Sequence, residues 1–253
     1  MPGRVRTDGS WSFSICGKHP AVADYVALGD HTPWFSAMSK VVASAYSSIL
    51  ARGHPPDALA PWDFWIALEH KDGLACGRVV PSRDRLNRPF PLLIMGQGSL
   101  QGWAGFWERL PLAMESTWDG MVGLASFQGH SLDMLSNGLS VLPEPDGGWM
   151  VRRDATIESD RDEAGPGRCH CSDGVVRLEI ESEINGCAEW GRVVEEAAKL
   201  LKQNTRTQSP PRAVFIQRGP ARTSMRLFFR PVSSPDFVDM WRSSGQDQGH
   251  GSN

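Results

Sequence analysis

The chain has 253 residues, which is enough for one large domain or two small ones with a substantial core. Its hydrophobic share of 40% and charged share of 22% are typical of a globular protein. The formal net charge of −3 argues against bulk electrostatic binding to nucleic acid or to an acidic membrane surface, so we expect no nucleic-acid partner.

Segments that would take the chain to a membrane are not found in the sequence. No run approaches the roughly 18 to 20 apolar residues that a membrane helix needs. The basic residues of MPGRVRTDGS are not followed by the apolar stretch of a secretory signal. Five cysteines at scattered spacing are typical of reduced thiols. We therefore expect a cytoplasmic protein without integral membrane insertion.

The N-terminal part predicts a strand, a turn and a helix, after a disordered stretch at residues 1–10. WSFSIC at residues 11–16 alternates bulky and small side chains, as a strand does. GKHPAVADYVALGD then indicates a Gly/Pro turn followed by a short amphipathic piece. Thr32 is a suitable N-cap with Pro33 at the first helical position, and apolar residues recur at helical spacing until Gly53.

Residues 63–95 change to a β pattern. Three apolar runs, FWIALE, LACGRVV and FPLLIM, are separated by turn chemistry, which predicts an antiparallel meander. Lys71-Asp72-Gly73 suits a tight hairpin turn for the first connection. Residues 81–89 form the second connection.

Helices are expected again from residue 103 onward. Large apolar residues recur at helical spacing over 103–120, and Pro111 should kink or split this helix. A second piece over about 130–138 should end at Asn137-Gly138. Residues 152–174 mix charge, glycine and proline without periodicity, which predicts a mobile polar loop.

The C-terminal part adds strands and two helices. VVRLEIE predicts a strand, and a helix should follow from about Asn185 to Gln203. AVFIQ and MRLFF form a hairpin, and Pro235 to Trp241 a short helix before a disordered tail at 243–253. The whole predicts a single α/β domain over residues 11–242, with helices packed on a mixed, mostly antiparallel sheet.

Motifs for phosphate binding and hydrolysis are incomplete. Gly17-Lys18 resembles the end of a phosphate-binding loop, but His19-Pro20 follows where Ser or Thr should stand. Gly129-His130-Ser131 resembles the nucleophile turn of a hydrolase but lacks its second glycine. The simpler interpretation of Ser131 is an N-cap for the helix behind it. We expect no catalytic residue.

One cysteine-rich segment suits a metal only poorly. Cys169-His170-Cys171, with Cys187 downstream, offers ligands that zinc prefers, but structural zinc sites usually space their cysteines as C-x2-4-C. Incidental thiols are the favoured interpretation, so no metal is expected. Cys16 and Cys76 lie in apolar runs and indicate small core residues. A small-molecule hydrolase or a metal-binding enzyme remains the alternative to a non-enzymatic protein.

Residues 81–92, PSRDRLNRPFPL, place Arg83, Asp84, Arg85 and Arg88 between two hydrophobic runs. Asp84 and the preceding Ser82 suit bonds to backbone N–H groups that would fix the connection. Asp84 also has Arg85 and Arg88 within reach as ion-pair partners.

Three interpretations of this loop stay open. The favoured one is structural, and Lys18 or Asp24 would join the same network if the two turns lie at one end of the sheet. A rigid guanidinium would also suit a carboxylate or phosphate of a partner protein. The third interpretation is an unidentified anion site.

Two segments resemble those of the TagF family of type VI secretion-associated repressors, and PWDFWIAL is similar to a third. The first matches the pattern G-K-x-P-x-x-x-D-[FY]-V with Gly17, Lys18, Pro20, Asp24, Tyr25 and Val26. The second matches G-x-x-x-P-S-x-D-R-x-x-R-x-F-P-L with Gly77, Pro81, Ser82, Asp84, Arg85, Arg88, Phe90, Pro91 and Leu92. Asn87 stands where the family usually has glycine, and asparagine also tolerates a positive φ.

The resemblance implies a three-layer α/β sandwich and a cytoplasmic, non-enzymatic regulator without a cofactor. Such a protein would repress type VI secretion after translation by binding a forkhead-associated scaffold component. The motif and partner-binding residues would be Gly17, Lys18, Asp24, Ser82, Arg83, Asp84, Arg85 and Arg88. The oligomeric state stays open.

Overall fold

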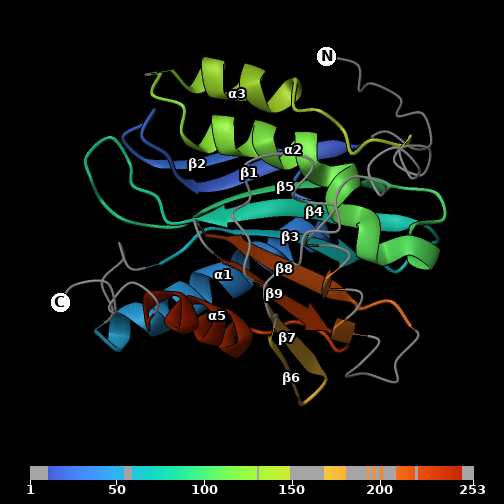
Figure 1. Cartoon of the computed structure of the whole chain (residues 1–253). Coiled ribbons are helices and arrows are strands. Elements are labelled where there is room, and N and C mark those ends of the chain that lie inside the picture. Colours follow the sequence, from blue (N-terminus) through green and yellow to red (C-terminus); the bar gives the residue numbers. More distant parts are fainter. Residues whose placement is uncertain are drawn as a thin grey trace.

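The structure is a computed structural model, and it describes residues 11–53, 59–129, 131–148, 168–180, 209–219 and 222–246, with residues 193, 196, 197, 200 and 201. Nine strands of this part form one sheet in the order β2-β1-β5-β4-β3-β8-β9-β7-β6 (Figure 1). The strands are β1 Ser12–Lys18, β2 Tyr25–Gly29, β3 Trp62–Ala67, β4 Gly73–Val80, β5 Leu92–Ser99, β6 Arg168–Ser172, β7 Val175–Ile180, β8 Ala213–Arg218 and β9 Thr223–Phe228.

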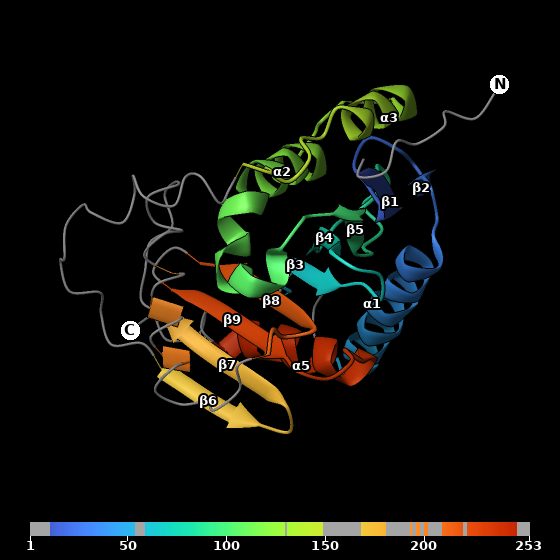
Figure 2. The same cartoon turned by 90° about the vertical axis from the view of Figure 1, so that its right-hand side faces the viewer.

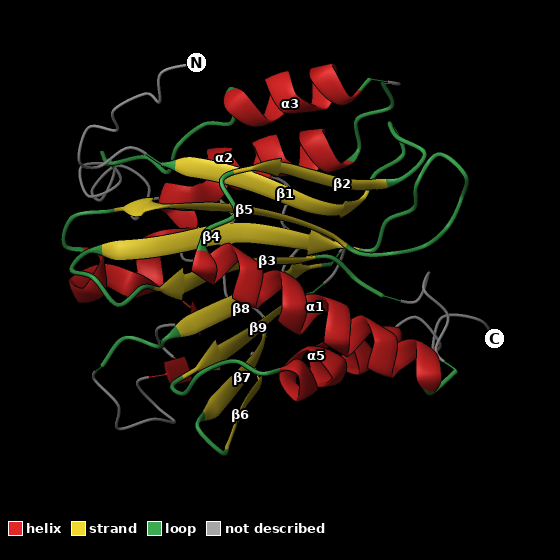
Figure 3. Ribbon diagram, turned by 180° about the vertical axis from the view of Figure 1, so that it is seen from behind, coloured by secondary structure: helices red, strands yellow, loops and turns green. Residues whose placement is uncertain are grey.

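Helices lie on both faces of the sheet. They are α1 Pro33–Ala51, the 3-10 helix η2 Trp103–Arg109, α2 Leu110–Ala125, α3 Leu132–Ser140 and α5 Ser234–Gln246. Helices α2 and α3 lie on one side (Figure 2), and α1 and α5 lie next to each other on the opposite side (Figure 3). The chain is therefore of the α/β class.

Each face of the sheet has its own core, because strand side chains alternate between the two faces. Beneath η2, α2 and α3 the core includes Trp65, Ile94, Trp118 and Leu135. Beneath α1 and α5 it includes Phe35, Phe64, Phe215 and Trp241. Trp65 and Phe64 are neighbours in β3, so one strand supplies a fully buried aromatic residue to each core.

The pairing of the strands confirms the predicted meander. Strands β3, β4 and β5 are adjacent, and Asp72 has the positive φ of 57° expected in the first turn. Every pair among the described strands is antiparallel, so the parallel pairing implied by a mixed sheet is not seen there. Five of these pairs join consecutive strands, and a short connection between consecutive strands allows only antiparallel pairing.

Helix boundaries agree with the sequence at three of four predicted points. Thr32 accepts the N–H of Phe35 at 3.1 Å as the N-cap of α1, and Gly53 follows its end with a φ of 79°. The predicted helix is split into η2 and α2, as expected, and Pro111 lies in the first turn of α2. The predicted stop of α3 at Gly138 was wrong, since the helix continues to Ser140. A Cβ at Gly138 would lie 2.8 Å from Leu124, so this glycine allows close approach to α2.

Three other segments differ from their predictions. Residues 25–29, expected as an amphipathic piece, form edge strand β2. Residues 168–172, expected within a mobile loop, form strand β6, because they pair with β7 through a turn at Asp173 and Gly174, both with positive φ. Helix α5 continues to Gln246, past its predicted end at Trp241, so the first residues of the predicted tail are helical.

Several predictions fall on parts of the chain that the structure does not describe. Residues 1–10, 152–167 and 247–253 lie outside the described residues. Of the helix predicted from Asn185 to Gln203, Val193, Glu196, Ala197, Leu200 and Leu201 are described and helical, and the four apolar residues among them are buried. Among the described residues, no helix combines the length and hydrophobicity that crossing a membrane requires.

Candidate functional site

The connection between β4 and β5, residues 81–91, is named here the arginine loop. It folds back on itself as a small hairpin, with a bridge between Arg83 and Pro89. The N–H of Phe90 donates to the carbonyl of Ser82 at 3.0 Å, and the N–H of Asn87 donates to the carbonyl of Asp84 at 2.8 Å. Asn87 has a φ of 62°, so asparagine takes the left-handed conformation expected at this position. The backbone of the loop is therefore fixed by its own hydrogen bonds.

Asp84 lies at the centre of this loop with a side chain that is 0% exposed. One carboxylate oxygen, Oδ1, accepts the backbone N–H groups of Leu86 and Arg88 at 3.0 and 2.9 Å. The other, Oδ2, accepts Nε of Arg88 at 2.7 Å and lies 3.1 Å from Nζ of Lys18. Burial opposes ionisation, but the bonds from the Arg88 backbone, Lys18 and the Arg88 guanidinium outweigh it and lower the pKa of Asp84 to about 2. Asp84 is ionised at neutral pH.

Residues 19–24, named here the first turn, pack against the arginine loop. The N–H of Arg85 donates to the carbonyl of Val22 at 2.8 Å. The guanidinium of Arg88 donates to the carbonyl of Ala23 and lies 4.0 Å from the carboxylate of Asp24. Asp24 is 91% exposed, so this last pair adds little stability. The two predicted motifs therefore form one structural unit.

Gly17 explains how closely the two motifs approach. It has a φ of 126°, and a Cβ on it would lie 2.1 Å from the carbonyl oxygen of Pro91 and 2.8 Å from Cα of Leu92. An L side chain fits neither the conformation nor the space. Glycine at this position is what lets β1 lie against the end of the arginine loop.

His19, which the sequence marked only as a break in a phosphate-binding pattern, is a buried hydrogen-bonded residue. Its side chain bonds at both ring nitrogens: the N–H of Ala21 donates to Nδ1 at 3.0 Å, and Nε2 lies 2.9 Å from the carbonyl of Leu124. Because Nδ1 accepts, Nε2 must carry the proton and donate. Burial lowers the pKa of His19, although its bond to Leu124 partly opposes that effect. A neutral imidazole thus joins the first turn to the end of α2.

The outer surface of the arginine loop is formed by Arg85 and Leu86. Leu86 is 61% exposed, and Arg85 is exposed with no bond of its guanidinium recorded among the described residues. Arg88 is committed to Asp84 and the first turn, and Nη1 of Arg83 donates to the carbonyl of Asn87 at 3.3 Å. Of the two ion-pair partners predicted for Asp84, Arg88 is the one that binds it, and Arg85 is exposed to solvent.

Ser82 and Asp24 have smaller roles than the sequence suggested. In the described part of the chain, Ser82 contributes to the loop through its carbonyl rather than through its hydroxyl. Asp24 accepts the N–H of Tyr25 at 2.8 Å, a local bond within the strand start. Lys18, Asp84 and Arg88 form the centre of the network.

The candidate catalytic serine has a structural position. Ser131 is the N-cap of α3, and its hydroxyl accepts the N–H of Asp133 at 3.2 Å, as the simpler interpretation predicted. His130 lies outside the described residues. The hydroxyl of Ser131 is therefore used in capping the N-terminus of α3.

The cysteine-rich segment forms the edge strand β6. The Sγ atoms of Cys169 and Cys171 lie 3.9 Å apart, while His170 between them belongs to the opposite face of the strand. Burial and the neighbouring thiol of Cys171 raise the pKa of Cys169 to about 11. The described residues contain no group of three or more metal-ligating side chains, and Cys187 lies outside them. Cys16 and Cys76 are buried, as predicted.

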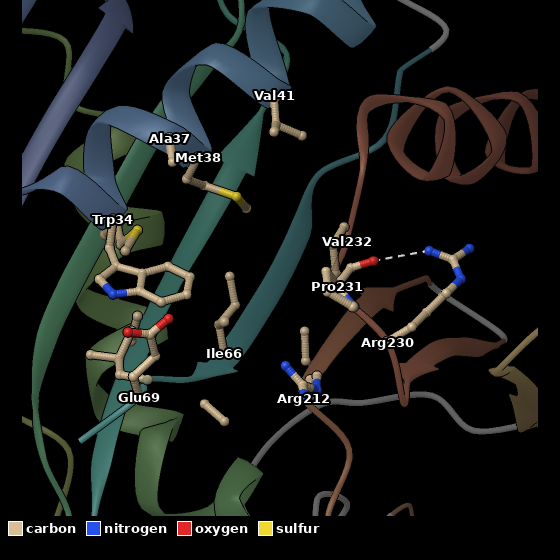
Figure 4. Close-up of a pocket in the computed structure, with 15 residues that line it drawn as sticks. Trp34, Ala37, Met38, Val41, Ile66, Glu69, Arg212, Arg230, Pro231 and Val232 are labelled. Carbon is tan, nitrogen blue, oxygen red and sulfur yellow. Dashed lines mark hydrogen bonds between the residues drawn. The ribbon is translucent and has the colours of Figure 1, made fainter. Parts of the chain in front are cut away.

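A pocket of about 560 Å³ that the sequence did not predict lies between α1 and the segment before α5 (Figure 4). Its floor is formed by the sheet, and its walls include Trp34, Met38 and Val41 on one side and Val232 on the other. Trp34 is 39% exposed at this pocket. Small alanines from α1, β3, β4 and β8 make the space, and an apolar group of moderate size fits it.

Charged residues stand only at the margin of this pocket. Glu69 and Arg212 are exposed, on its opposite sides (Figure 4). Arg230 donates to both carboxylate oxygens of Asp236, at 2.8 and 2.6 Å, and to the carbonyl of Pro231. The interior offers no cluster of acid, base and nucleophile among its described lining residues.

Comparison with known proteins identifies a family. Residues 14–125 match the model of the TagF N-terminal domain, type VI secretion system-associated. The fold is similar to the crystal structure of PA0076 from Pseudomonas aeruginosa PAO1, with a TM-score of 0.50 and 16% sequence identity. The superposition covers 91% of this chain and 94% of that chain. At this identity the likeness concerns the fold alone. No curated protein matches the chain.

The matched segment contains β1, the first turn and the whole arginine loop. These are the parts that Gly17, Lys18 and Asp84 hold together. Residues 14–125 are therefore a TagF N-terminal domain, type VI secretion system-associated.

Proposed function

We propose that the protein is a cytoplasmic, non-enzymatic repressor of type VI secretion, built as a three-layer α/β sandwich. It acts after translation, by binding a forkhead-associated scaffold component of the secretion machine. The observation that carries the proposal is the TagF N-terminal domain over residues 14–125. The arginine loop lies within that domain and is the part of it that we assign to the partner.

The fixed backbone of the arginine loop supports a binding role. Arg85 and Leu86 stand at its outer surface, while Asp84 beneath them holds the loop through Lys18 and Arg88. A loop that is already ordered loses little conformational entropy when a partner binds. The guanidinium of Arg85 suits a carboxylate or phosphate of the partner, and Leu86 supplies apolar contact beside it.

The hydrogen bonds and the burial of the reactive side chains support a non-enzymatic role. Both ring nitrogens of His19 are hydrogen-bonded, the hydroxyl of Ser131 caps α3, and burial raises the pKa of the Cys76 thiol. Catalysis needs a nucleophile and a base within reach of a substrate. These three groups are occupied or enclosed by the fold.

Co-purification tests the proposal directly. The full chain and the forkhead-associated scaffold protein are produced together, one of them tagged, and secretion is measured in cells that overproduce the chain. The proposal expects a complex that survives size-exclusion chromatography and reduced secretion at unchanged levels of the secretion proteins. Absence of a complex together with unchanged secretion would refute it. Stoichiometric recovery with sheath or baseplate proteins instead would indicate a structural subunit.

A further inference from the structure

A second surface, outside the arginine loop, has the character of a protein-binding groove. It lies between α2 and α3 and has a volume of about 290 Å³. Every residue that lines it is apolar or glycine: Gly120, Gly123, Leu124, Phe127, Met134, Gly138, Val141, Leu142 and Pro143. Helices α2 and α3 lie side by side at the outside of the molecule, with the sheet behind them (Figures 1 and 2). We name this surface the α2–α3 groove.

Glycines give the groove its depth, in two different ways. Gly138 lets the helices approach, since a Cβ there would lie 2.8 Å from Cδ1 of Leu124. Gly123 has no such packing role, because a Cβ there would meet nothing within 4 Å. Glycine in the interior of a helix costs stability without a compensating contact here. A close approach by another molecule is a physical reason for leaving that space empty.

Exposed apolar side chains are concentrated on the two helices of this groove, and two of them, Met134 and Val141, line it. Among the described residues eight large hydrophobic side chains are exposed, and four of them belong to α2, α3 and the residue that follows α3: Val122, Leu132, Met134 and Val141. Val141 is 77% exposed and Met134 is 53% exposed. Single exposed apolar residues are ordinary, but a cluster at a groove marks an interaction surface.

The charged residues of the segment that forms the groove are all acidic. Residues 110–151 contain five acidic residues, Glu115, Asp119, Asp133, Glu144 and Asp146, and no lysine or arginine. Asp119, Asp133 and Glu144 each directly adjoin a residue that lines the groove. Arg218 of β8 pairs with Asp119 at 3.2 Å, whereas Glu144 accepts the neutral N–H of Trp11 at 3.3 Å. The surround of the groove is therefore acidic.

We propose that the α2–α3 groove binds an amphipathic helix of a partner protein, with an apolar face flanked by lysine or arginine. A helix can pack its apolar side chains against two neighbouring helices, and the glycines allow its backbone to approach. Basic residues beside the apolar face complement the acidic surround. The same acidic surround would repel anionic lipid headgroups, so the exposed apolar side chains do not suit a membrane surface.

This inference goes beyond the proposed function, because no contact of the arginine loop enters it. The groove requires a basic amphipathic helix, whereas Arg85 requires an anion. If substitution of Arg85 abolished scaffold binding, the proposal for the α2–α3 groove would be unaffected. The two surfaces are therefore tested by different variants.

The test uses the full chain and a synthetic helical peptide of about 18 residues, five turns of helix, with leucine on one face and lysine on the other. Binding is measured by fluorescence anisotropy at low and at physiological salt. The same peptide with glutamate in place of lysine controls for charge. Gly123→Leu places a side chain in the groove from a Cβ position with nothing within 4 Å, and it replaces one of the weakest helix formers, so the fold should be kept.

Gly105→Leu is the matched control, since Gly105 also faces open space but lies in η2, outside the groove. We expect Gly123→Leu to weaken binding of the lysine peptide at least tenfold and Gly105→Leu to leave it unchanged. Asp133→Asn should weaken it about two- to threefold at low salt and less at physiological salt. The glutamate peptide should bind at least tenfold more weakly than the lysine peptide.

Equal binding by the Gly123→Leu and Gly105→Leu variants would overturn the proposal, and so would equal binding of the two peptides. Sedimentation analysis of the chain alone tests whether a second copy of the chain occupies the groove. A dimer that Gly123→Leu separates into monomers, and Gly105→Leu does not, would assign the groove to self-association and overturn the proposal. Unchanged sedimentation of all three proteins as monomers agrees with it.

Discussion

The Nζ atom of Lys18 lies 3.1 Å from Oδ2 of Asp84, which joins the end of β1 to the connection between β4 and β5. Strand β5 lies between β1 and β4 in the sheet, so the ion pair fixes the β4–β5 connection to a strand that does not pair with β4. The Asp84 side chain is 0% exposed and that of Lys18 only 17%. Charge and burial together hold the first turn and the arginine loop as one unit.

Asp84 should make the stability of the protein depend on pH in the acid range. Its folded pKa of about 2 lies below the ordinary value of 3.8, so the folded state binds fewer protons between these values. The stabilisation is complete above about pH 3.8 and is lost as the pH falls towards 2. Asp84→Asn should remove this part of the acid dependence and lower the melting temperature at neutral pH. Thermal unfolding from pH 2 to 7 checks both effects.

Asp24→Asn is the control for that experiment, because Asp24 is 91% exposed and close to the same Arg88. It should leave the melting temperature and the acid profile near those of the wild type. Identical profiles for Asp84→Asn and the wild type would show that Asp84 does not hold the loop.

Gly17→Ala should destabilise the protein strongly. The new Cβ would need to lie 2.1 Å from the carbonyl oxygen of Pro91, at a φ of 126°. We expect a loss on the order of 3 kcal/mol in the free energy of unfolding, measured with urea. Gly53→Ala separates strain from crowding, since Gly53 has a φ of 79° but nothing within 4 Å of its Cβ position. It should cost about 1 to 2 kcal/mol, from conformation alone. Equal losses for both variants would contradict the close approach.

His19 should lower the stability of the protein as the pH falls below about 6.5. Burial lowers the folded pKa of His19 from its ordinary value of 6.5, so the unfolded state binds more protons in the window between the two values. The free energy of unfolding therefore decreases as the pH falls through that window. His19→Gln should make this slope shallower, and cost about 1 to 3 kcal/mol at pH 7.5 if it leaves Ala21 or Leu124 unpaired.

Urea unfolding of both proteins at several pH values between 5 and 8 measures the two effects separately. The same slope in the wild type and in His19→Gln would assign the pH dependence in this range to other groups.

Local chemistry in the sequence was sufficient for much of the fold. The meander, the split at Pro111 and the caps at Thr32 and Ser131 each depend on residues close together in the chain. The sequence alone does not distinguish a glycine that ends a helix from a glycine that packs against a second helix. Gly138 was expected to end α3, but it lies inside the helix, where a Cβ would be 2.8 Å from Cδ1 of Leu124 in α2. Strand β6 was missed because its polar residues carry no periodic signal, and only pairing with β7 makes them a strand.

The candidate site was predictable to a similar degree. Pairing of Asp84 within the arginine loop followed from turn chemistry, whereas the choice of Arg88 over Arg85 depends on the orientation of two side chains. His19 and the pocket beside Trp34 were not foreseen, since their contacts to Leu124 and Val232 span long stretches of chain. The α2–α3 groove also needs the packing of two helices, although its lack of basic residues is visible in the sequence.

The most direct test of a fixed loop that presents Arg85 measures the affinity and the stability of one variant together. Arg85→Glu is titrated into the forkhead-associated scaffold protein by calorimetry, and its melting temperature is compared with that of the wild type. Arg52→Glu, the same charge change at the exposed C-cap of α1, is the control. We predict at least tenfold weaker binding by Arg85→Glu only, with its melting temperature within about a degree of that of the wild type. Unchanged affinity, or a melting temperature that falls together with the affinity, would contradict this account.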